Sequence, residues 1–212
     1  KDYLVVNVKC AKIELYKKLS TKKNTLNPYI FFQSLYSSLT KKDTVVLGNG
    51  TACVVGLQCA DLPKGTRVYT NSGSASMGYD LPAAIGSSIA NRNKRVLCVT
   101  GDGSIMMNIQ ELASINYKKL PIKVFILNNN GYHSIRQTQK NFFPDNLVGT
   151  CKKDGIGFPN FLKLGRAFSI RTVVIKNEEK LNLLLKSKPF LDFAPTKFVI
   201  NINQRQEFYP KL

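Results

Sequence analysis

The stretch VLCVTGDGS, residues 96–104, decides the fold together with IKVFILNNNG, residues 122–131. Each stretch starts as an apolar run typical of a buried strand and ends in glycine, aspartate or asparagine residues that favour turns. Between them, residues 108–119 have apolar residues at helical spacing, and Leu120-Pro121 ends the helix. Two strands joined by a helix form a βαβ unit, so we expect these strands to be parallel neighbours.

The same alternation extends outward from this unit in both directions. A further helix is expected after Asn27-Pro28, where asparagine can cap the helix and proline suits its first position. Because the strands are apolar almost throughout and alternate with helices, they predict a parallel sheet covered on both faces. The predicted fold class is therefore a doubly wound α/β domain with a mainly parallel, six-stranded sheet. The strands are expected at Thr44–Leu47, Arg67–Tyr69, Val96–Thr100, Lys123–Leu127, Thr172–Ile175 and Lys197–Ile202, with helices over about 51–59, 80–91, 108–119, 132–140, 160–168 and 178–187.

The chain divides into two unequal parts. Residues 3–8 have the pattern of a strand, residues 11–20 that of a short basic helix, and polar residues follow them. We therefore interpret residues 1–24 as the tail of a preceding central domain with its linker, and residues 25–212 as one C-terminal domain. The chain begins with Lys1 and has no signal-peptide pattern, so we expect a fragment or a processed form. No apolar run approaches the roughly eighteen residues of a membrane span, so no membrane partner is expected.

The formal net charge of +18 raises the question of a nucleic-acid partner. The positive residues form short pairs spread along the chain, with no long basic run and no aromatic-interleaved RNA motif. This pattern argues against nucleic acid, and a non-catalytic basic binding module is kept only as an alternative. The five cysteines are scattered and none forms a CxxC pair, which indicates a reducing, cytoplasmic location. With His133 as the only histidine, no zinc site is expected.

Polar side chains follow the two strands of the central βαβ unit where each strand ends. Asp102 comes directly after the first strand, and Asn128-Asn129-Asn130-Gly131 follows the second. Parallel neighbouring strands end at the same edge of a sheet, so these groups should lie side by side. A carboxylate, an amide oxygen and a nearby carbonyl suit Mg²⁺, which completes its octahedron with phosphate oxygens and water. The sequence therefore predicts a metal-bridged diphosphate site, although either motif alone would be an ordinary turn or loop.

The spacing from Gly101-Asp102-Gly103 to Asn128-Asn129 resembles the signature shared by thiamine-diphosphate enzymes. The sequence around it, GDGSIMMNIQELASINYKKLPIKVFILNNNGY, is similar to the acetolactate synthase branch, as are residues 48–52 and 71–86. The resemblance runs from about Asn27 to the C-terminus. It identifies the chain as the C-terminal, diphosphate-binding domain of such an enzyme, and it implies thiamine diphosphate and Mg²⁺ as cofactors.

The resemblance also implies roles for individual residues. Mg²⁺ would be bound by the side chains of Asp102 and Asn129 and by the Gly131 carbonyl. The Ala75 carbonyl would accept a hydrogen bond from the aminopyrimidine, Met77 would impose a bent cofactor, and the helix after Gly50 would add its positive end. The full set expected to meet the cofactor is Gly50, Thr51, Ala52, Ala75, Ser76, Met77, Gly101, Gly103, Ser104 and Asn129.

The sequence departs from acetolactate synthases just after the asparagines. Where those enzymes commonly have a Gly-Met pair, this chain has His133-Ser134, followed by Ile135. His133, Ser134 and Ile135 are therefore the candidates for lining the reacting end of the cofactor. A smaller, more polar residue suggests another donor or acceptor, so a related lyase, decarboxylase or carboligase of sugar or polysaccharide metabolism is the alternative. His133 is either a proton-transfer group or an ordinary loop residue.

The resemblance implies an enzyme that decarboxylates a 2-oxo acid, such as pyruvate, and transfers the resulting acyl carbanion to a carbonyl acceptor. In this family the glutamate that activates the cofactor lies in a separate N-terminal domain, and no segment of this chain matches it. We therefore expect the chain to be inactive by itself and the full-length protein to be a homodimer or homotetramer. The family's middle domain binds FAD in some members, so FAD is a further candidate cofactor of the full-length protein. A nicotinamide-binding domain is disfavoured, because no GxGxxG motif follows the first strand.

Overall fold

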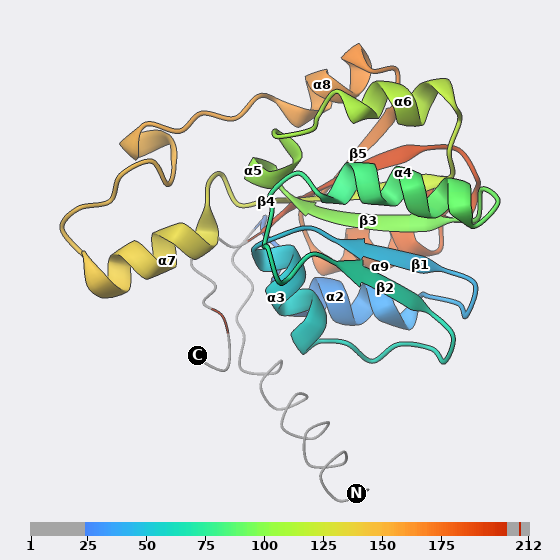
Figure 1. Ribbon diagram of the computed structural model, residues 1–212, viewed down its shortest axis with the longest axis horizontal. Coiled ribbons are helices and arrows are strands. Elements are labelled where there is room, and N and C mark those ends of the chain that lie inside the picture. The colour runs from blue at the N-terminus through green and yellow to red at the C-terminus, as the bar shows by residue number, and fades with distance from the viewer. Residues whose placement is uncertain (1–23, 203–207, 209–212) are drawn as a thin grey trace, which may run out of the picture.

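Six parallel strands form the centre of the molecule, as the sequence predicts (Figure 1). The computed structural model describes residues 24–202 and Phe208. The strands follow the order β2-β1-β3-β4-β6-β5, and every neighbouring pair runs parallel. Their bounds are β1 Thr44–Leu47, β2 Arg67–Thr70, β3 Val96–Gly101, β4 Ile122–Asn128, β5 Arg171–Ile175 and β6 Thr196–Asn201.

Helices cover both faces of this sheet, which makes the fold doubly wound. One face carries α2 (Pro28–Ser37), α3 (Thr51–Gln58), α9 (Glu178–Leu185) and α10 (Lys188–Leu191). The other face carries α4 (Asp80–Ala90), α6 (Glu111–Tyr117) and α8 (Phe161–Ala167). Two helices follow strand ends closely, α5 (Asp102–Ile105) after β3 and α7 (His133–Phe142) after β4, and the short 3₁₀ helix η1 spans Lys152–Asp154 (Figure 1). No helix in the part of the chain that the structure describes has the length and apolar character of a membrane span.

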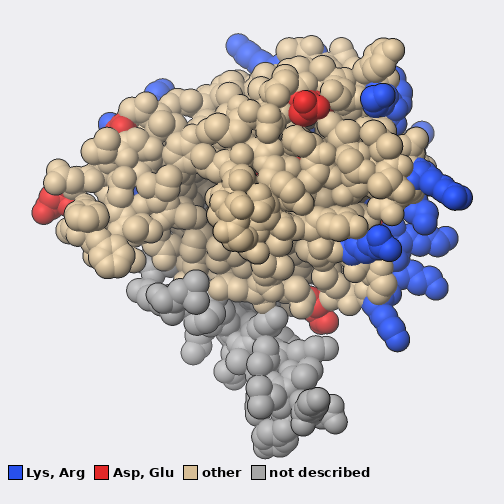
Figure 2. Space-filling model, in the orientation of Figure 1, with Lys and Arg blue, Asp and Glu red and all other residues tan. Residues whose placement is uncertain are grey.

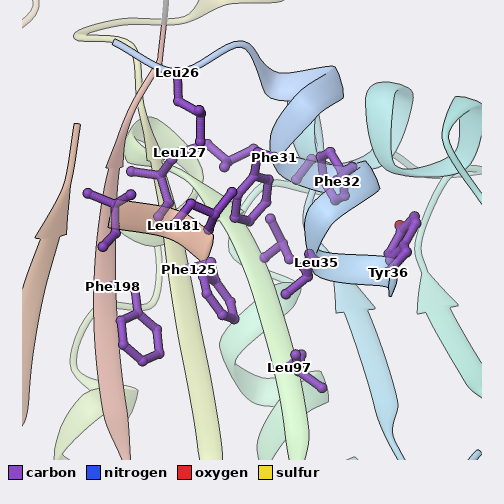
Figure 3. Packing of buried hydrophobic residues seen from close by; sticks show 14 of the residues in the cluster. Leu26, Phe31, Phe32, Leu35, Tyr36, Leu97, Phe125, Leu127, Leu181 and Phe198 are labelled. Carbon is purple, nitrogen blue, oxygen red and sulfur yellow. The ribbon is translucent and has the colours of Figure 1, made fainter. Parts of the chain in front are cut away.

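The larger of the two apolar cores lies between the sheet and helices α2, α3 and α9 (Figure 3). Phe31 of α2 lies 5.6 Å from Phe125 of β4, and Phe125 stacks on Phe198 of β6 at 4.9 Å, measured between ring centroids. The start of α2 is fixed by Asn27, whose Oδ1 accepts a hydrogen bond from the Tyr29 nitrogen at 2.8 Å. Aromatic rings bury large apolar areas, so this packing anchors β4 and β6 beneath their carboxyl ends.

Some local predictions are wrong in detail. The Gly101-Asp102-Gly103 segment is not an open turn but the entry into α5, and neither glycine has a positive φ. The helix expected from Asn108 begins only at Glu111. The Asn108 side chain is engaged elsewhere, because its Nδ2 donates to the Gly78 carbonyl at 2.8 Å and its Oδ1 accepts from the Gln110 side chain at 3.1 Å instead of from a backbone N–H of a first helical turn. The short helix α10 was not predicted.

The expected tail of a preceding domain, residues 1–24, lies outside the described residues apart from Asn24. The strand expected at residues 3–8 and the helix expected at residues 11–20 therefore stay predictions.

Lysine and arginine side chains gather at the end of the molecule opposite α7 (Figure 2). Several of them lie within three positions of the start of a strand, with Lys41-Lys42 before β1, Lys64 before β2, Lys94 before β3 and Lys119 before β4. The amino ends of parallel strands share one edge of the sheet, and the carboxyl ends share the other. These lysines thus lie at the edge of the sheet opposite to the one at which the diphosphate site is predicted.

Candidate functional site

A pocket lies at the carboxyl ends of β1, β3 and β4, where the sequence places its polar motifs. Its wall combines four segments that are distant in the sequence: the start of α3, the loop before α4, the start of α5 and the loop from β4 into α7. The predicted site residues found in this wall are Gly50, Thr51, Met77, Gly101, Asp102, Gly103, Ser104, Asn129, Gly131, His133, Ser134 and Ile135. Asn49 and Tyr132, which lie in the quoted motifs but were given no role of their own, complete the wall.

Three predicted residues lie outside this wall. The Ala52 side chain is fully buried in the core beneath α3, so it can offer only its backbone to a ligand. Ala75 and Ser76 are exposed in the loop between β2 and α4. Ala75 has a φ of +51°, and the Ser76 hydroxyl accepts a hydrogen bond from Asn71 Nδ2 at 3.2 Å. Their cofactor contacts stay predictions.

Asp102 joins α5 to the loop that follows β4. Its Oδ2 accepts hydrogen bonds from the backbone nitrogens of Asn129 and Gly131, both at 3.1 Å, and its Oδ1 accepts from the Gly103 nitrogen at 2.9 Å. The side chain is almost fully buried, and burial raises the pKa of Asp102 to about 6, while these backbone hydrogen bonds limit the rise. The expectation that the two motifs lie side by side is therefore correct.

The loop after β4 is held by a second segment of the chain. Gly131 pairs with Cys151 in an antiparallel bridge, and the Tyr132 nitrogen donates to the Thr150 carbonyl at 2.9 Å. A Cβ at Gly131 would lie 2.1 Å from the Thr150 oxygen, and the φ of +156° also favours glycine. The sequence marks residues 141–160 only as an irregular stretch. The structure shows that two of its residues fix the backbone at the predicted metal site.

A buried arginine lies behind the predicted metal ligands. Asn129 is 5% exposed, and its Oδ1 faces Arg136 of α7, whose Nη2 is 3.5 Å away. The Arg136 Nε is buried and has no hydrogen-bond partner among the described residues. The arrangement places a positive charge directly behind the pocket wall. Because an arginine in a polar helix is ordinarily exposed, nothing in the sequence marks this position.

Gly103 is required by close packing and not by backbone conformation. A Cβ on this residue would lie 2.1 Å from Cε1 of the Tyr132 ring. That ring is itself held edge-on against Phe158, with 5.8 Å between the ring centroids. The Tyr132 ring therefore leaves no room for a larger residue at position 103.

The start of α3 presents backbone N–H groups at the pocket. Gly50 precedes the helix with a φ of +76°, a conformation that favours glycine, and no side chain caps the first turn. Gly50 and Thr51 both line the wall, so the positive end of an eight-residue helix faces the pocket. Ser134 lies opposite, because a Cβ built on Gly50 would be 3.5 Å from its Oγ.

A fully buried carboxylate, Asp80, lies beneath the pocket. Its Oδ2 accepts hydrogen bonds from Thr100 Oγ1 at 2.7 Å and from Ser104 Oγ at 2.8 Å. Burial raises the pKa of Asp80, and the hydrogen bonds from both hydroxyls oppose that rise. Sequence reasoning assigned no role to Asp80, since a single aspartate at the start of a helix is an ordinary capping signal.

The oxygen donors of the pocket fit a particular kind of metal site. Asp102 is the one carboxylate in the wall, and the other predicted donors are the Asn129 amide and the Gly131 carbonyl. Among residues 24–202 and Phe208, no group of three or more His, Cys, Asp or Glu side chains could hold a metal ion. A hard divalent cation shared with an oxygen-rich anion fits this donor set better than an ion held by protein side chains alone.

The fold and this pocket agree with a known class of protein. Residues 48–189 match the family model described as "Thiamine pyrophosphate enzyme, C-terminal TPP binding domain". The chain therefore belongs to the thiamine pyrophosphate enzymes and contains their C-terminal, cofactor-binding domain. The resemblance inferred from the sequence motifs is confirmed.

Within that family the chain is similar to acetolactate synthase large subunits. It is 41% identical over 141 residues to the large subunit of Porphyra purpurea, a match that covers 66% of this chain and 23% of that protein. It is 36% identical over 141 residues to the isozyme 2 large subunit of Escherichia coli (strain K12), covering 66% of this chain and 25% of that protein. The chain thus spans about a quarter of the length of the curated relatives it matches.

A solved structure supports the fold. The thiamine diphosphate-dependent 4-hydroxybenzoylformate decarboxylase of Rhodococcus jostii RHA1 superposes with a TM-score of 0.73 at 24% sequence identity. The superposition covers 88% of this chain and 34% of the decarboxylase chain. The two proteins share the doubly wound architecture.

Proposed function

We propose that Asp102, Asn129 and Gly131 hold a Mg²⁺ ion through which this chain binds the diphosphate of thiamine diphosphate. One observation carries the proposal: the Asp102 Oδ2 lies 3.1 Å from the backbone nitrogens of both Asn129 and Gly131. That contact brings the backbone segment that carries the Asn129 amide and the Gly131 carbonyl next to the Asp102 carboxylate. Three protein donors leave coordination positions for phosphate oxygens and water.

The remaining wall residues have roles that follow from their position. The first turn of α3, after Gly50, offers N–H groups to the diphosphate, since helix N-termini favour anions. Gly103 lets the backbone of α5 approach, and Met77, 37% exposed, supports the body of the cofactor. When bound, thiamine diphosphate supplies a stabilised carbanion for breaking and making carbon–carbon bonds next to a carbonyl. The residues of this chain bind and orient that group.

We further propose that the full-length protein decarboxylates a 2-oxo acid such as pyruvate and transfers the acyl unit to a carbonyl acceptor. The similarity to acetolactate synthase large subunits supports this reaction. On this proposal the activating glutamate comes from another domain, so a homodimer or homotetramer of the full-length protein is the active species. This chain alone would bind the cofactor without turnover. FAD would be held outside the described residues.

A second candidate function is a decarboxylase or carboligase that acts on a sugar-derived carbonyl compound. Ser134 favours it, because its hydroxyl lies in the pocket wall opposite Gly50. A hydroxyl there can exchange hydrogen bonds with a polyhydroxylated substrate, which an apolar side chain cannot do. Mass spectrometry of the products would separate the two candidates. Acetolactate formed by the full-length protein from pyruvate alone favours the first, and a product that requires an added sugar aldehyde favours the second.

Calorimetric titration with thiamine diphosphate, with and without Mg²⁺, tests the binding proposal. The wild-type protein should bind only when Mg²⁺ is present. Asp102→Ala should weaken binding by more than the roughly 10- to 100-fold that the loss of an outer-sphere metal partner costs. Glu179→Ala, which removes an exposed carboxylate from α9, is the control and should bind as the wild type does. Unchanged binding by Asp102→Ala, or binding independent of Mg²⁺, contradicts the proposal.

A further inference from the structure

We infer that Asp80 is a positioning residue of the cofactor site, because its buried carboxylate holds the loop carrying Met77 and the start of α5 in one fixed relation. The inference rests on the proposed binding of thiamine diphosphate in this pocket. It concerns how the body of the cofactor is placed, whereas the metal-binding residues concern how its diphosphate is held.

The Asp80 carboxylate is an acceptor shared by three elements of the fold. Its Oδ2 accepts from Thr100 at the end of β3 and from Ser104 in α5, at 2.7 and 2.8 Å, and its Oδ1 accepts from the Leu81 nitrogen in α4 at 2.9 Å. The side chain has no exposed surface, and no lysine or arginine forms an ion pair with it among the described residues. A buried carboxylate is costly unless donors satisfy it, so these contacts fix its position closely.

Ser104 transmits this constraint to the loop before α4. Its Oγ donates to Asp80 and accepts from the Gly78 nitrogen at 3.0 Å. The Gly78 carbonyl accepts from Asn108 Nδ2 at 2.8 Å, and a Gly78 φ of +82° excludes most other residues. Both backbone groups of Gly78 are therefore held, and Met77, whose side chain lines the pocket, directly precedes it.

The same contacts change the role expected of Ser104. Because its hydroxyl donates to Asp80 and accepts from Gly78, the hydroxyl is already engaged on both sides. The single hydroxyl proton is therefore not free for a diphosphate in the pocket, and the side chain serves the loop. Ser104 thus acts as the link between Asp80 and the loop.

Replacing Asp80 should weaken binding at the two ends of the cofactor to different degrees. Asp80 makes no hydrogen bond to Asp102, Asn129 or Gly131 and reaches α5 only through the Ser104 hydroxyl, so we expect the diphosphate end to be affected less than the end at Met77. Asp80→Ala should weaken binding of Mg²⁺–thiamine diphosphate by about tenfold and binding of Mg²⁺–pyrophosphate by less than about threefold. Asp80→Asn keeps the size of the side chain but replaces one acceptor by a donor, so it should fall between Asp80→Ala and the wild type.

The test uses the full-length protein, calorimetry with both ligands, and near-ultraviolet circular dichroism of the bound cofactor as a signature of its placement. The matched control is Asp43→Asn. Asp43 is also a buried carboxylate, but it lies at the amino end of β1 and accepts from Arg95 at 2.6 and 2.7 Å. The Asp43→Asn substitution should lower the stability of the protein while leaving both affinities and the spectrum of the bound cofactor unchanged. Ser104→Ala should reproduce the effect of Asp80→Ala, and the double variant should bind no more weakly than either single variant.

The outcomes separate this inference from the proposed function. The inference is overturned if both Asp80 variants bind with wild-type affinity and leave the spectrum of the bound cofactor unchanged. It is also overturned if Asp80→Ala loses affinity equally for the two ligands, or if the affinity losses of Asp80→Ala and Ser104→Ala are additive. If Asp80→Ala does not fold, Asp80→Asn and Ser104→Ala carry the same comparison. If Asp102→Ala binds thiamine diphosphate normally, the proposed function itself fails. If Asp102→Ala loses binding and the Asp80 variants do not, only the positioning role is wrong.

Discussion

Replacing Gly48 by alanine should destabilise the protein, because the new methyl group would meet the Asp80 carboxylate. An ideally placed Cβ at Gly48 would lie 2.3 Å from the Asp80 Oδ2, whereas ordinary contacts begin at 3.4 Å. The carboxylate would have to move by about 1 Å, which would break its hydrogen bonds to Thr100 and Ser104. The backbone itself would accept alanine, since residue 48 does not have a positive φ.

The magnitude follows from two costs. Overpacking a closed site costs about 1–3 kcal/mol. Weakened hydrogen bonds to a buried charged group add about 1.5–3 kcal/mol. The variant should therefore lose about 2.5–6 kcal/mol, a large part of a typical stability of about 5–15 kcal/mol. When Asp80 is also alanine, the Oδ2 and Cγ atoms that lie 2.3 and 3.1 Å from the added methyl group are gone, and the Cβ of residue 80 remains at 3.2 Å. The two substitutions should be coupled by about 2–3 kcal/mol.

Urea unfolding followed by far-ultraviolet circular dichroism measures this coupling in the wild type, Gly48→Ala, Asp80→Ala and the double variant. Gly86→Ala is the control, because it lies inside α4 and nothing stands within 4 Å of a Cβ built there. It should stabilise the protein by about 0.4–1 kcal/mol, since alanine loses less conformational freedom on folding. The reasoning is refuted if Gly48→Ala is harmless, or if it costs as much without the Asp80 carboxylate as with it.

Three further predictions concern the site and the core. Gly103→Ala should weaken Mg²⁺–thiamine diphosphate binding at least about tenfold, because its Cβ would lie 2.1 Å from the Tyr132 ring, and Tyr132→Ala should restore part of the loss in calorimetry. Burial lowers the pKa of Lys197 to about 8, so the folded state binds fewer protons than the unfolded state between that pKa and the ordinary value of 10.5. At pH 7 Lys197→Met should therefore be more stable than the wild type by about 1–3 kcal/mol, a figure that includes the loss of the hydrogen bond to the Phe161 carbonyl. Urea unfolding should show that this advantage shrinks as the pH rises from about 8 to 10.5. Chelation of divalent metal should release bound thiamine diphosphate during gel filtration, and added Mg²⁺ should restore binding; retention of the cofactor after chelation would contradict the single-carboxylate site.

Local sequence was enough to predict the six strands and most of the helices, because nearby residues specify each of these elements. The apolar runs that become β3 and β4 and the capping pair Asn27-Pro28 act within a few positions of the elements they define. The start of α6 was misplaced for the opposite reason. Asparagine is a favoured helix cap, but the Asn108 Nδ2 is held by the Gly78 carbonyl of a distant loop and its Oδ1 accepts from the Gln110 side chain.

The sequence by itself determined the pairing of Asp102 with the asparagines after β4. The two strands are parallel neighbours in register, Gly101 beside Leu127, so residues that follow them must meet at one edge of the sheet. Only the tertiary structure decided what surrounds that pair. Three contacts depend on how helices and loops pack on the sheet: Asp80 with Ser104, the Thr150 carbonyl with Gly131, and the Tyr132 ring with Gly103. Close packing sets those contacts between segments far apart in the chain, and no periodic pattern in the sequence records them.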